Sequence, residues 1–175
     1  MKKVLVLLMV VCGLSVAAFG TPLDALTALL DKDCITGADA ATFFTQIMTC
    51  CPGLAEIEDC VTIEQLSLCL FDALDLSGTF LEMLFGYSSA EKIRIAQREC
   101  VMVVGVASDK ITGYDLAAIA TGVSRYLLRV YRRPECFTLN ATQIKALMAS
   151  AQALLPPGVL AQLLPCAGAD YAPTS

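Results

Sequence analysis

Apolar residues recur about every three to four positions along most of this chain, which is the spacing of one face of an α-helix. Leu23, Leu26 and Leu29 show it near the start, and Leu116, Ile119 and Val123 show it later. No hairpin signal interrupts the pattern. The periodicity and its breaks predict helices over 22–30, 36–51, 62–74, 80–85, 89–107, 112–133, 144–155 and 159–164.

Two of these segments begin with the same device. Thr36 and Thr112 are each followed by glycine and, three positions on, by Asp39 and Asp115. A threonine with an acid three residues later favours a helix start, because the two side chains satisfy free amides reciprocally. The segment 89–107 is more ambiguous, because its β-branched run 101–106 leaves a strand open. We favour helix there, because the corresponding part of the first half has helical spacing.

The segment 33–62 is repeated 76 positions later as 109–138, without a gap. Nine of the thirty positions are identical, where roughly two would be expected by chance. The pairs are Asp33/Asp109, Ile35/Ile111, Thr36/Thr112, Gly37/Gly113, Asp39/Asp115, Ala41/Ala117, Thr45/Thr121, Cys60/Cys136 and Thr62/Thr138. The sequence therefore predicts an all-α, disulfide-bonded helical bundle built from two pseudo-repeats packed as one body. The predicted divisions are a signal peptide (1–20), a first helical repeat (21–100), a second (101–166) and a loose tail (167–175).

The first twenty residues have the pattern of a secretory signal. Lys2 and Lys3 precede an apolar run over 4–11, and Ala18-Phe19-Gly20 supplies small residues at cleavage spacing. We expect the exported chain to begin at Thr21 and to be extracellular. No later apolar segment is long enough to predict a membrane span.

Cysteine content agrees with export. Of nine cysteines, Cys12 lies in the signal, and the remaining eight form an even set typical of disulfides. They are Cys34, Cys50, Cys51, Cys60, Cys69, Cys100, Cys136 and Cys166. Without histidine or a C-x₂-C pair, a metal site is disfavoured, and we expect no cofactor. Equivalent places in the two repeats suggest the pairs Cys60–Cys100 and Cys136–Cys166.

The other four cysteines resist this scheme. A straight helix from Cys34 to Cys50 would separate them by roughly 20 Å, whereas a disulfide needs Cα atoms within about 7 Å. Pairing Cys34 with Cys69 would leave a vicinal bond between Cys50 and Cys51. Three explanations stay open: the helix breaks, the symmetric pairing is wrong, or one cysteine bonds another chain.

Charge is distributed unevenly. Residues 21–100 hold thirteen acidic and four basic side chains, whereas 101–175 hold four acidic and six basic. The formal net charge of −5 for the whole chain disfavours nucleic acid as a partner. Halves of opposite sign could dock on each other, within one chain or between chains.

Apolar residues are in excess. Counting Ala, Val, Ile, Leu, Met, Phe, Cys and Gly, roughly 57% of residues 21–175 are apolar, against about 45–50% in ordinary domains. A cavity for an apolar ligand, a self-association surface or a densely packed core would each bury the surplus. Phe43, Phe44, Phe80, Met83 and Phe85 are the aromatic and sulfur-containing candidates for lining a cavity.

Catalytic equipment is sparse. The absence of histidine removes Ser-His-Asp and Cys-His mechanisms. Glu56, Glu58 and Asp59 form an acidic cluster that could serve a carboxylate hydrolase, although a solvated loop explains it more simply. We therefore do not expect an enzyme.

Two further features are candidate sites. Arg125, Arg129, Arg132 and Arg133 form a basic stripe that could contact an anion or an acidic partner, or simply face solvent. Asn140-Ala141-Thr142 is a glycosylation sequon in an exported chain, with a helix cap as the alternative role.

Together these observations favour a secreted, non-enzymatic binding or interaction protein carrying an apolar small molecule or meeting a protein partner. The alternative is a self-associating extracellular component that forms a homo-oligomer.

Overall fold

The structure, a computed structural model of the chain, describes residues 21–49, 53–78, 83–84, 86–130 and 137–164. These residues form seven α-helices, one short 3₁₀-helix and no β-strand, which confirms the predicted all-α class. The elements are α2 (Pro22–Leu29), α3 (Gly37–Phe44), η1 (Leu54–Glu56), α4 (Ile63–Ala73), α6 (Ser89–Arg98), α7 (Gly113–Val130), α8 (Ala141–Leu154) and α9 (Val159–Leu163).

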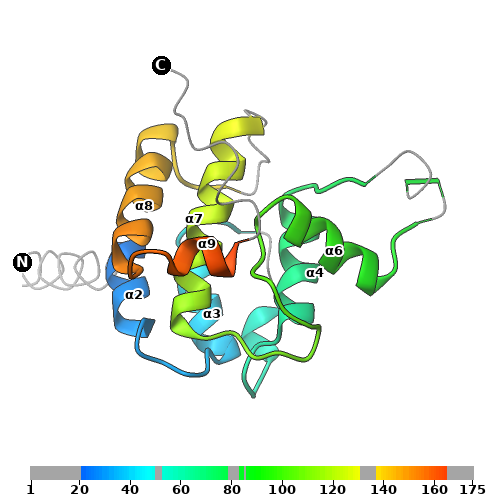
Figure 1. Cartoon of the computed structure of the whole chain (residues 1–175), viewed down its shortest axis with the longest axis horizontal. Helices are drawn as coiled ribbons and strands as arrows, with labels where there is room; N and C mark the ends of the chain where they lie inside the picture. The colour runs from blue at the N-terminus through cyan, green and yellow to red at the C-terminus, as the bar shows by residue number, and fades with distance from the viewer. Residues whose placement is uncertain (1–20, 50–52, 79–82, 85, 131–136, 165–175) are drawn as a thin grey trace, which may run out of the picture.

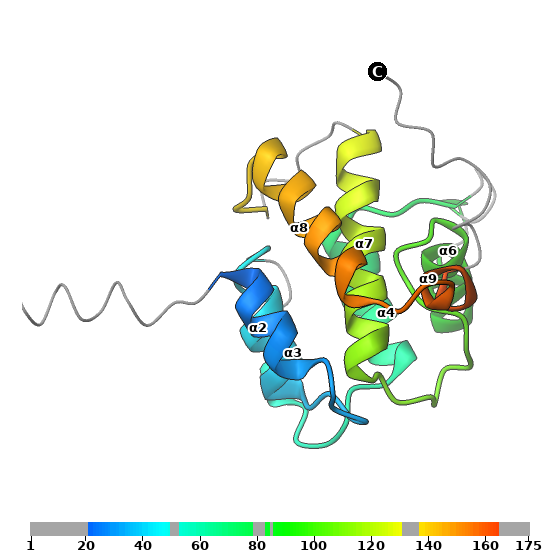
Figure 2. The same ribbon diagram turned by 60° about the vertical axis from the view of Figure 1, so that its left-hand side comes forward.

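Helix α7 is the centre of the arrangement. It lies beside α8 along most of its length, while α2 packs against both α8 and α3 (Figures 1 and 2). Helices α4 and α6 form a second packed pair on the other side of α7. Helices from the two halves of the chain are therefore in direct contact, as α2 is with α7 and α8.

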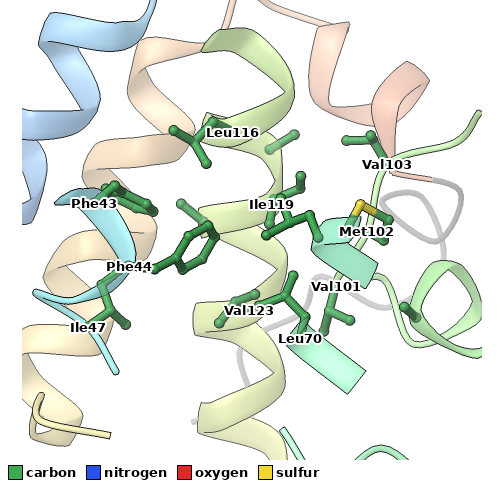
Figure 3. Close-up of a cluster of buried hydrophobic side chains, with 14 of the residues drawn as sticks. Phe43, Phe44, Ile47, Leu70, Val101, Met102, Val103, Leu116, Ile119 and Val123 are labelled. Carbon is green, nitrogen blue, oxygen red and sulfur yellow. The ribbon is translucent and has the colours of Figure 1, made fainter. Parts of the chain in front are cut away.

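The core forms around α7, whose residues 116–124 are all buried (Figure 3). A helix that is buried on every side, here including the polar residues Thr121 and Ser124, needs packing partners all round. Leu116, Ile119 and Val123 meet Phe43 and Phe44 of α3, with Leu70 of α4 and the segment 101–103 on the other side. Phe43 and Phe44 contact each other edge to face, with ring centroids 5.1 Å apart. Both rings are fully buried in this core, and neither is among the residues that line the groove described below.

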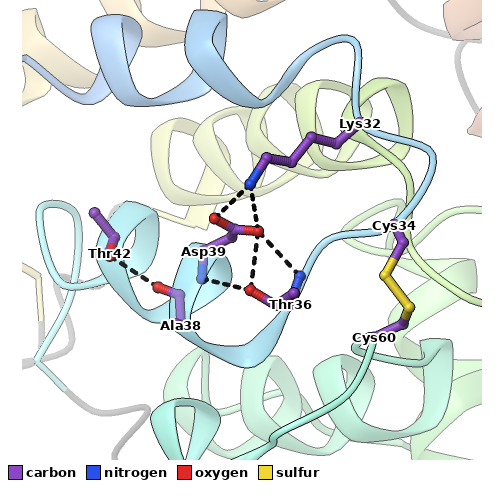
Figure 4. A network of polar contacts seen from close by, with 7 residues as sticks. All are labelled: Lys32, Cys34, Thr36, Ala38, Asp39, Thr42 and Cys60. Atoms are coloured by element: carbon purple, nitrogen blue, oxygen red, sulfur yellow. Dashed lines mark hydrogen bonds and ion pairs between the residues drawn. A yellow bond between two sulfur atoms is a disulfide. The ribbon is translucent and has the colours of Figure 1, made fainter.

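Except for α9, the α-helices of the described residues begin with the same capping chemistry. The Thr36 hydroxyl caps the Asp39 amide at 3.2 Å, and the Asp39 carboxylate accepts from the Thr36 amide at 3.2 Å and hydroxyl at 2.9 Å (Figure 4). Lys32 adds an ion pair to Asp39 at 2.8 Å. Thr112 and Asp115 form the same box at the start of α7. Both predicted Thr-Gly-x-Asp helix starts are confirmed.

Three apolar residues that precede threonine caps form a closed ring of backbone hydrogen bonds. Ile35 donates to Ile111 at 2.8 Å, Ile111 to Val61 at 2.9 Å, and Val61 to Ile35 at 2.8 Å. All three side chains are fully buried. The starts of α3, α4 and α7 are therefore fixed at one buried junction by segments far apart in the sequence.

This junction explains the disulfide. Cys34 and Cys60 stand directly before Ile35 and Val61, and the isolated antiparallel bridge between Thr36 and Cys60 aligns the two segments. Their Cα atoms are 5.5 Å apart and their sulfur atoms are bonded (Figure 4). The predicted pair Cys60–Cys100 is wrong, because symmetry between repeats took no account of this strand-like pairing within the first half.

The structure says less about the remaining six cysteines. Cys69 and Cys100 are also disulfide-bonded. Cys50, Cys51, Cys136 and Cys166 lie outside the described residues, and with them the predicted pair Cys136–Cys166.

Two predicted helices end early. The helix predicted over 36–51 ends at Phe44. A break in this helix was one of the three explanations left open for the pairing of the cysteines. The helix predicted over 89–107 ends at Arg98. Beyond it Cys100 adopts a left-handed backbone with φ of 58°, and 101–107 is neither helix nor strand. This irregular segment is nevertheless buried at Val101, Met102 and Val103. Its apolar residues therefore reflect packing in the core and not a regular helix or strand.

Candidate functional site

A half-open groove lies between the start of α2 and one face of α8, with a volume of about 300 Å³. Its apolar lining comes from Pro22, Leu23, Leu139, Ala146 and Leu147. Thr21, Gln143 and Ser150 supply polar atoms. Helices α2 and α8 are in contact, with α2 below α8 in Figure 1 and to its left in Figure 2, so the groove follows their contact.

The α2 wall is set by a rigid helix start. Thr21 caps Asp24, the Asp24 carboxylate returns to the Thr21 amide at 2.8 Å, and Pro22 occupies the first helical turn. Leu26 and Leu29 continue the same helical stripe into the core, where both are buried. Leu23 begins that stripe beyond the edge of the core, so it is half-buried and available to a ligand.

The α8 wall is a stripe one helix face wide. Gln143, Ala146, Leu147 and Ser150 follow at i, i+3, i+4 and i+7, the spacing that aligns side chains along one face. Leu147 is buried while Ala146 is exposed, so the stripe runs from the core edge outward. Ile144 and Ala151 lie on the core-facing side and are buried, and they hold α8 in place.

None of the side chains that line the groove is charged. Asp24, which is exposed, lies one residue beyond Leu23 on α2. Hydrogen bonds from the Thr21 hydroxyl and from the Thr21 amide hold the pKa of Asp24 below its ordinary value, so it is anionic at neutral pH. The mostly apolar lining therefore suits an apolar molecule.

The lining offers no nucleophile paired with a base. It provides apolar surface and three polar side chains, which suits binding rather than chemistry. Among the described residues, no group of three or more Cys, Asp or Glu side chains is placed to hold a metal ion.

The predicted basic stripe is only partly described. Arg125 and Arg129 lie one turn apart on α7, where Arg125 is half-buried and Arg129 exposed. Arg129 donates to Glu99 at 2.7 Å, and its guanidinium lies over the Tyr126 ring at 5.6 Å. Glu99 belongs to the acidic first half of the chain and Arg129 to the more basic second half. The two halves therefore form at least one ion pair with each other within a single chain. Arg132 and Arg133 lie outside the described residues.

Asn140 lies beside the groove. Its side chain caps α8, with Oδ1 accepting from the Gln143 amide at 3.0 Å, while the Gln143 carboxamide accepts from the Asn140 amide at 2.8 Å. The alternative role for this residue, a helix cap, is therefore present. Both Asn140 and Thr142 are exposed.

The acidic cluster stays on the surface. Glu56, Glu58 and Asp59 are all exposed, at the end of η1 and in the segment that leads to Cys60. None of them lines the groove.

Sequence reasoning missed the groove itself, because its two walls lie more than a hundred residues apart and each wall resembles an ordinary amphipathic helix. One usable signal was present: Leu23 and Ala146 extend apolar stripes beyond the residues that the core needs.

Comparison with models of protein families, with curated proteins and with solved structures gives no match for this chain. In the described part of the chain, no helix combines the length and the apolar character needed to cross a membrane. Function is therefore inferred from the residues and geometry above.

Proposed function

We propose that this is an exported, non-enzymatic helical protein that binds an uncharged apolar small molecule in the α2–α8 groove. The observation that carries the proposal is the groove itself, about 300 Å³ in volume and lined by uncharged, mostly apolar side chains. This volume is at the lower end of the range of small-molecule sites, about 300–1,000 Å³. A ligand there would contact Leu23, Ala146 and Leu147 and could hydrogen-bond to Gln143 or Ser150.

Export is supported by two independent features. The signal pattern ends at Gly20, directly before the Thr21 cap, so cleavage there would leave α2 and its capping box complete. Cys34 and Cys60 are bonded, and Cys69 and Cys100 are also in disulfides, which is typical of an oxidising compartment.

A binding titration tests the groove. The secreted protein is titrated with the uncharged fluorescent probe N-phenyl-naphthylamine, and the same titration is made with Ala146→Trp. Ala146 lines the groove, so an indole at this position fills the space. We expect the wild type to bind and the variant to lose at least about tenfold in affinity, or about 1.4 kcal/mol.

Ala153→Trp is the matched control. Ala153 is exposed on the same helix and is not among the groove-lining residues, so this variant should bind like the wild type. The proposal fails if the wild type binds no apolar probe, or if both tryptophan variants weaken binding equally.

A second candidate function is self-association, favoured by exposed apolar side chains outside the groove. Val104 and Val106 are 57% and 64% exposed, and Met83 and Leu84 are 59% and 62% exposed. Surfaces of this kind often mark contacts between proteins. Sedimentation of the wild type and of Val104→Ser/Val106→Ser decides it: a dimer that the double variant converts to monomer supports self-association, and a monomeric wild type excludes it.

Descent of the two halves from one duplicated unit is part of this proposal. It is supported by the two Thr-Gly-x-Asp boxes, which both start helices at the same junction. The halves have diverged in length as well as charge, since α3 has 8 residues and α7 has 18. The groove lies between a helix of the first half and a helix of the second, so divergence of the two would have created it.

A further inference from the structure

We infer that Asn140 carries an N-linked glycan while its side chain also caps α8. The inference depends on the export that is part of the proposed function. Asn140 is the only asparagine in the chain, and Thr142 completes its sequon. Both residues are exposed at the start of α8, where a large substituent can extend into solvent.

The two roles use different atoms of one side chain. Capping uses Oδ1, which accepts from the Gln143 amide at 3.0 Å. Glycosylation uses Nδ2, which the capping box leaves outside its hydrogen bonds. A glycosylated asparagine keeps its carbonyl oxygen and one N–H, so the sugar does not remove the cap.

The choice of asparagine here is not explained by capping alone. The other capping boxes of the described residues use threonine at 21, 36, 62 and 112, and serine at 88. Serine caps helices about as well as asparagine, and threonine caps them somewhat less well. Asparagine appears only where it completes a sequon.

The chemistry is a group transfer from a lipid-linked oligosaccharide pyrophosphate. A bond forms between Asn140 Nδ2 and the anomeric carbon of the first sugar, and the bond from that carbon to the pyrophosphate oxygen breaks. Nδ2 loses one proton, and the lipid pyrophosphate leaves with the bonding electron pair. No oxidant or reductant is needed.

The glycan would stand at one end of the groove. Leu139 and Gln143 line the groove on either side of Asn140 in sequence, whereas Asn140 itself is exposed and is not part of the lining. A bulky, hydrated chain at this rim would keep a flat protein surface away from the start of α8. It would leave the groove open to small molecules, in agreement with the ligand proposed above.

The test is secretion of the full chain from cultured animal cells, followed by peptide mass mapping before and after enzymatic removal of N-glycans. Enzymatic removal converts a glycosylated asparagine to aspartate, so the mass of the peptide containing residue 140 reports occupancy. The chain is expressed once with its own first twenty residues and once with a proven signal from another secreted protein in their place. We expect a glycan on Asn140 in both cases.

Three variants separate sugar from cap. Asn140→Asp and Thr142→Ala remove the sequon but keep a capping side chain at position 140, so both should be secreted folded and without sugar. Thr142→Ser keeps the sequon and should retain the glycan. An unmodified Asn140 in the wild type carrying the foreign signal, beside a normally glycosylated reference protein, would overturn the inference. Failure of secretion with the chain's own first twenty residues alone would instead overturn the proposed export.

Discussion

The amide of Ile35 donates a 2.8 Å hydrogen bond to the carbonyl of Ile111, so the two residues that precede the repeated Thr-Gly turns contact each other directly. They are 76 positions apart in the sequence, and both side chains are fully buried. With Val61 they close a ring that fixes the first turns of α3, α4 and α7 together. Local helix signals in distant segments thus become one tertiary junction, whose stability can be tested residue by residue.

Gly113 is expected to tolerate no side chain. A Cβ atom there would overlap the backbone carbonyls of Leu29 and Leu30 at the end of α2, and backbone cannot move aside cheaply. Gly113→Ala should lower the free energy of unfolding by about 1–3 kcal/mol or more, measured by urea denaturation.

Gly53→Ala is the matched control for this test. Among the described residues, no atom beyond its chain neighbours lies within 4 Å of the added methyl group, and the backbone φ of −83° is ordinary for alanine. Its stability should be unchanged or raised by about 0.4–1 kcal/mol. Equal destabilisation by both substitutions would contradict the close approach of α2 to α7.

The Cys34–Cys60 bond should stabilise the same junction from one side. It closes a loop of sequence separation 26, for which the chain-entropy estimate is about 3–4 kcal/mol. Cys34→Ala/Cys60→Ala should lose stability of that order in thermal or chemical unfolding. Peptide mapping without reduction should recover Cys34 linked to Cys60, and a peptide linking Cys60 to Cys100 would refute the pairing.

Acid should weaken the start of α3. Burial acts to raise the pKa of Asp39, but hydrogen bonds from Lys32 and Thr36 and the Lys32 charge outweigh it, so the pKa lies below its ordinary value of 3.8. Since the folded-state pKa is the lower one, this contribution is complete above the unfolded-state pKa and is lost as the pH falls below about 4.

Asp39→Asn should therefore cost about 1 kcal/mol at neutral pH and nearly nothing in strong acid, measured as unfolding free energy against pH. Asp72→Asn is the control, because that carboxylate is 68% exposed and contributes through an open ion pair with Lys92. If the difference in unfolding free energy between wild type and Asp39→Asn persisted unchanged in acid, the charged carboxylate of Asp39 would be ruled out as the source of this stability.

The pair of Arg129 and Glu99 should contribute little to stability. The contact is 2.7 Å, but the Arg129 side chain is 61% exposed, and exposed pairs contribute about 0.2–1 kcal/mol. A double-mutant cycle of Arg129→Ala and Glu99→Ala should give a coupling of this size that falls with added salt. A salt-insensitive coupling above about 2 kcal/mol would indicate a desolvated pair instead.

Local signals predicted helix existence and helix starts well. Thr36, Thr62 and Thr112 all cap helices, because capping depends on residues within one turn. The class of fold followed from the 3.6-residue periodicity, and Val159–Leu163 forms the short last helix expected.

Tertiary pairing was not predictable in the same way. Cys60 bonds Cys34 because Val61 and Ile35 pair through their backbones, and backbone pairing leaves no side-chain pattern in a single sequence. Val101 to Val103 have the apolar pattern of a regular element, but Cys100 turns left-handed and the buried segment follows the shape of its neighbours. The groove was hidden for the same reason, since Leu23 and Ala146 come together only after α2 and α8 pack.

The most direct test of the central claim is methyl NMR of the purified protein, beginning at Thr21, during titration with decanol, an uncharged apolar probe. We predict that saturable shifts concentrate on the methyl groups of Leu23, Leu139 and Leu147, and that Ala146→Trp abolishes them. Shifts centred instead on Val104 and Val106, or no saturable shifts at all, would contradict ligand binding in the α2–α8 groove.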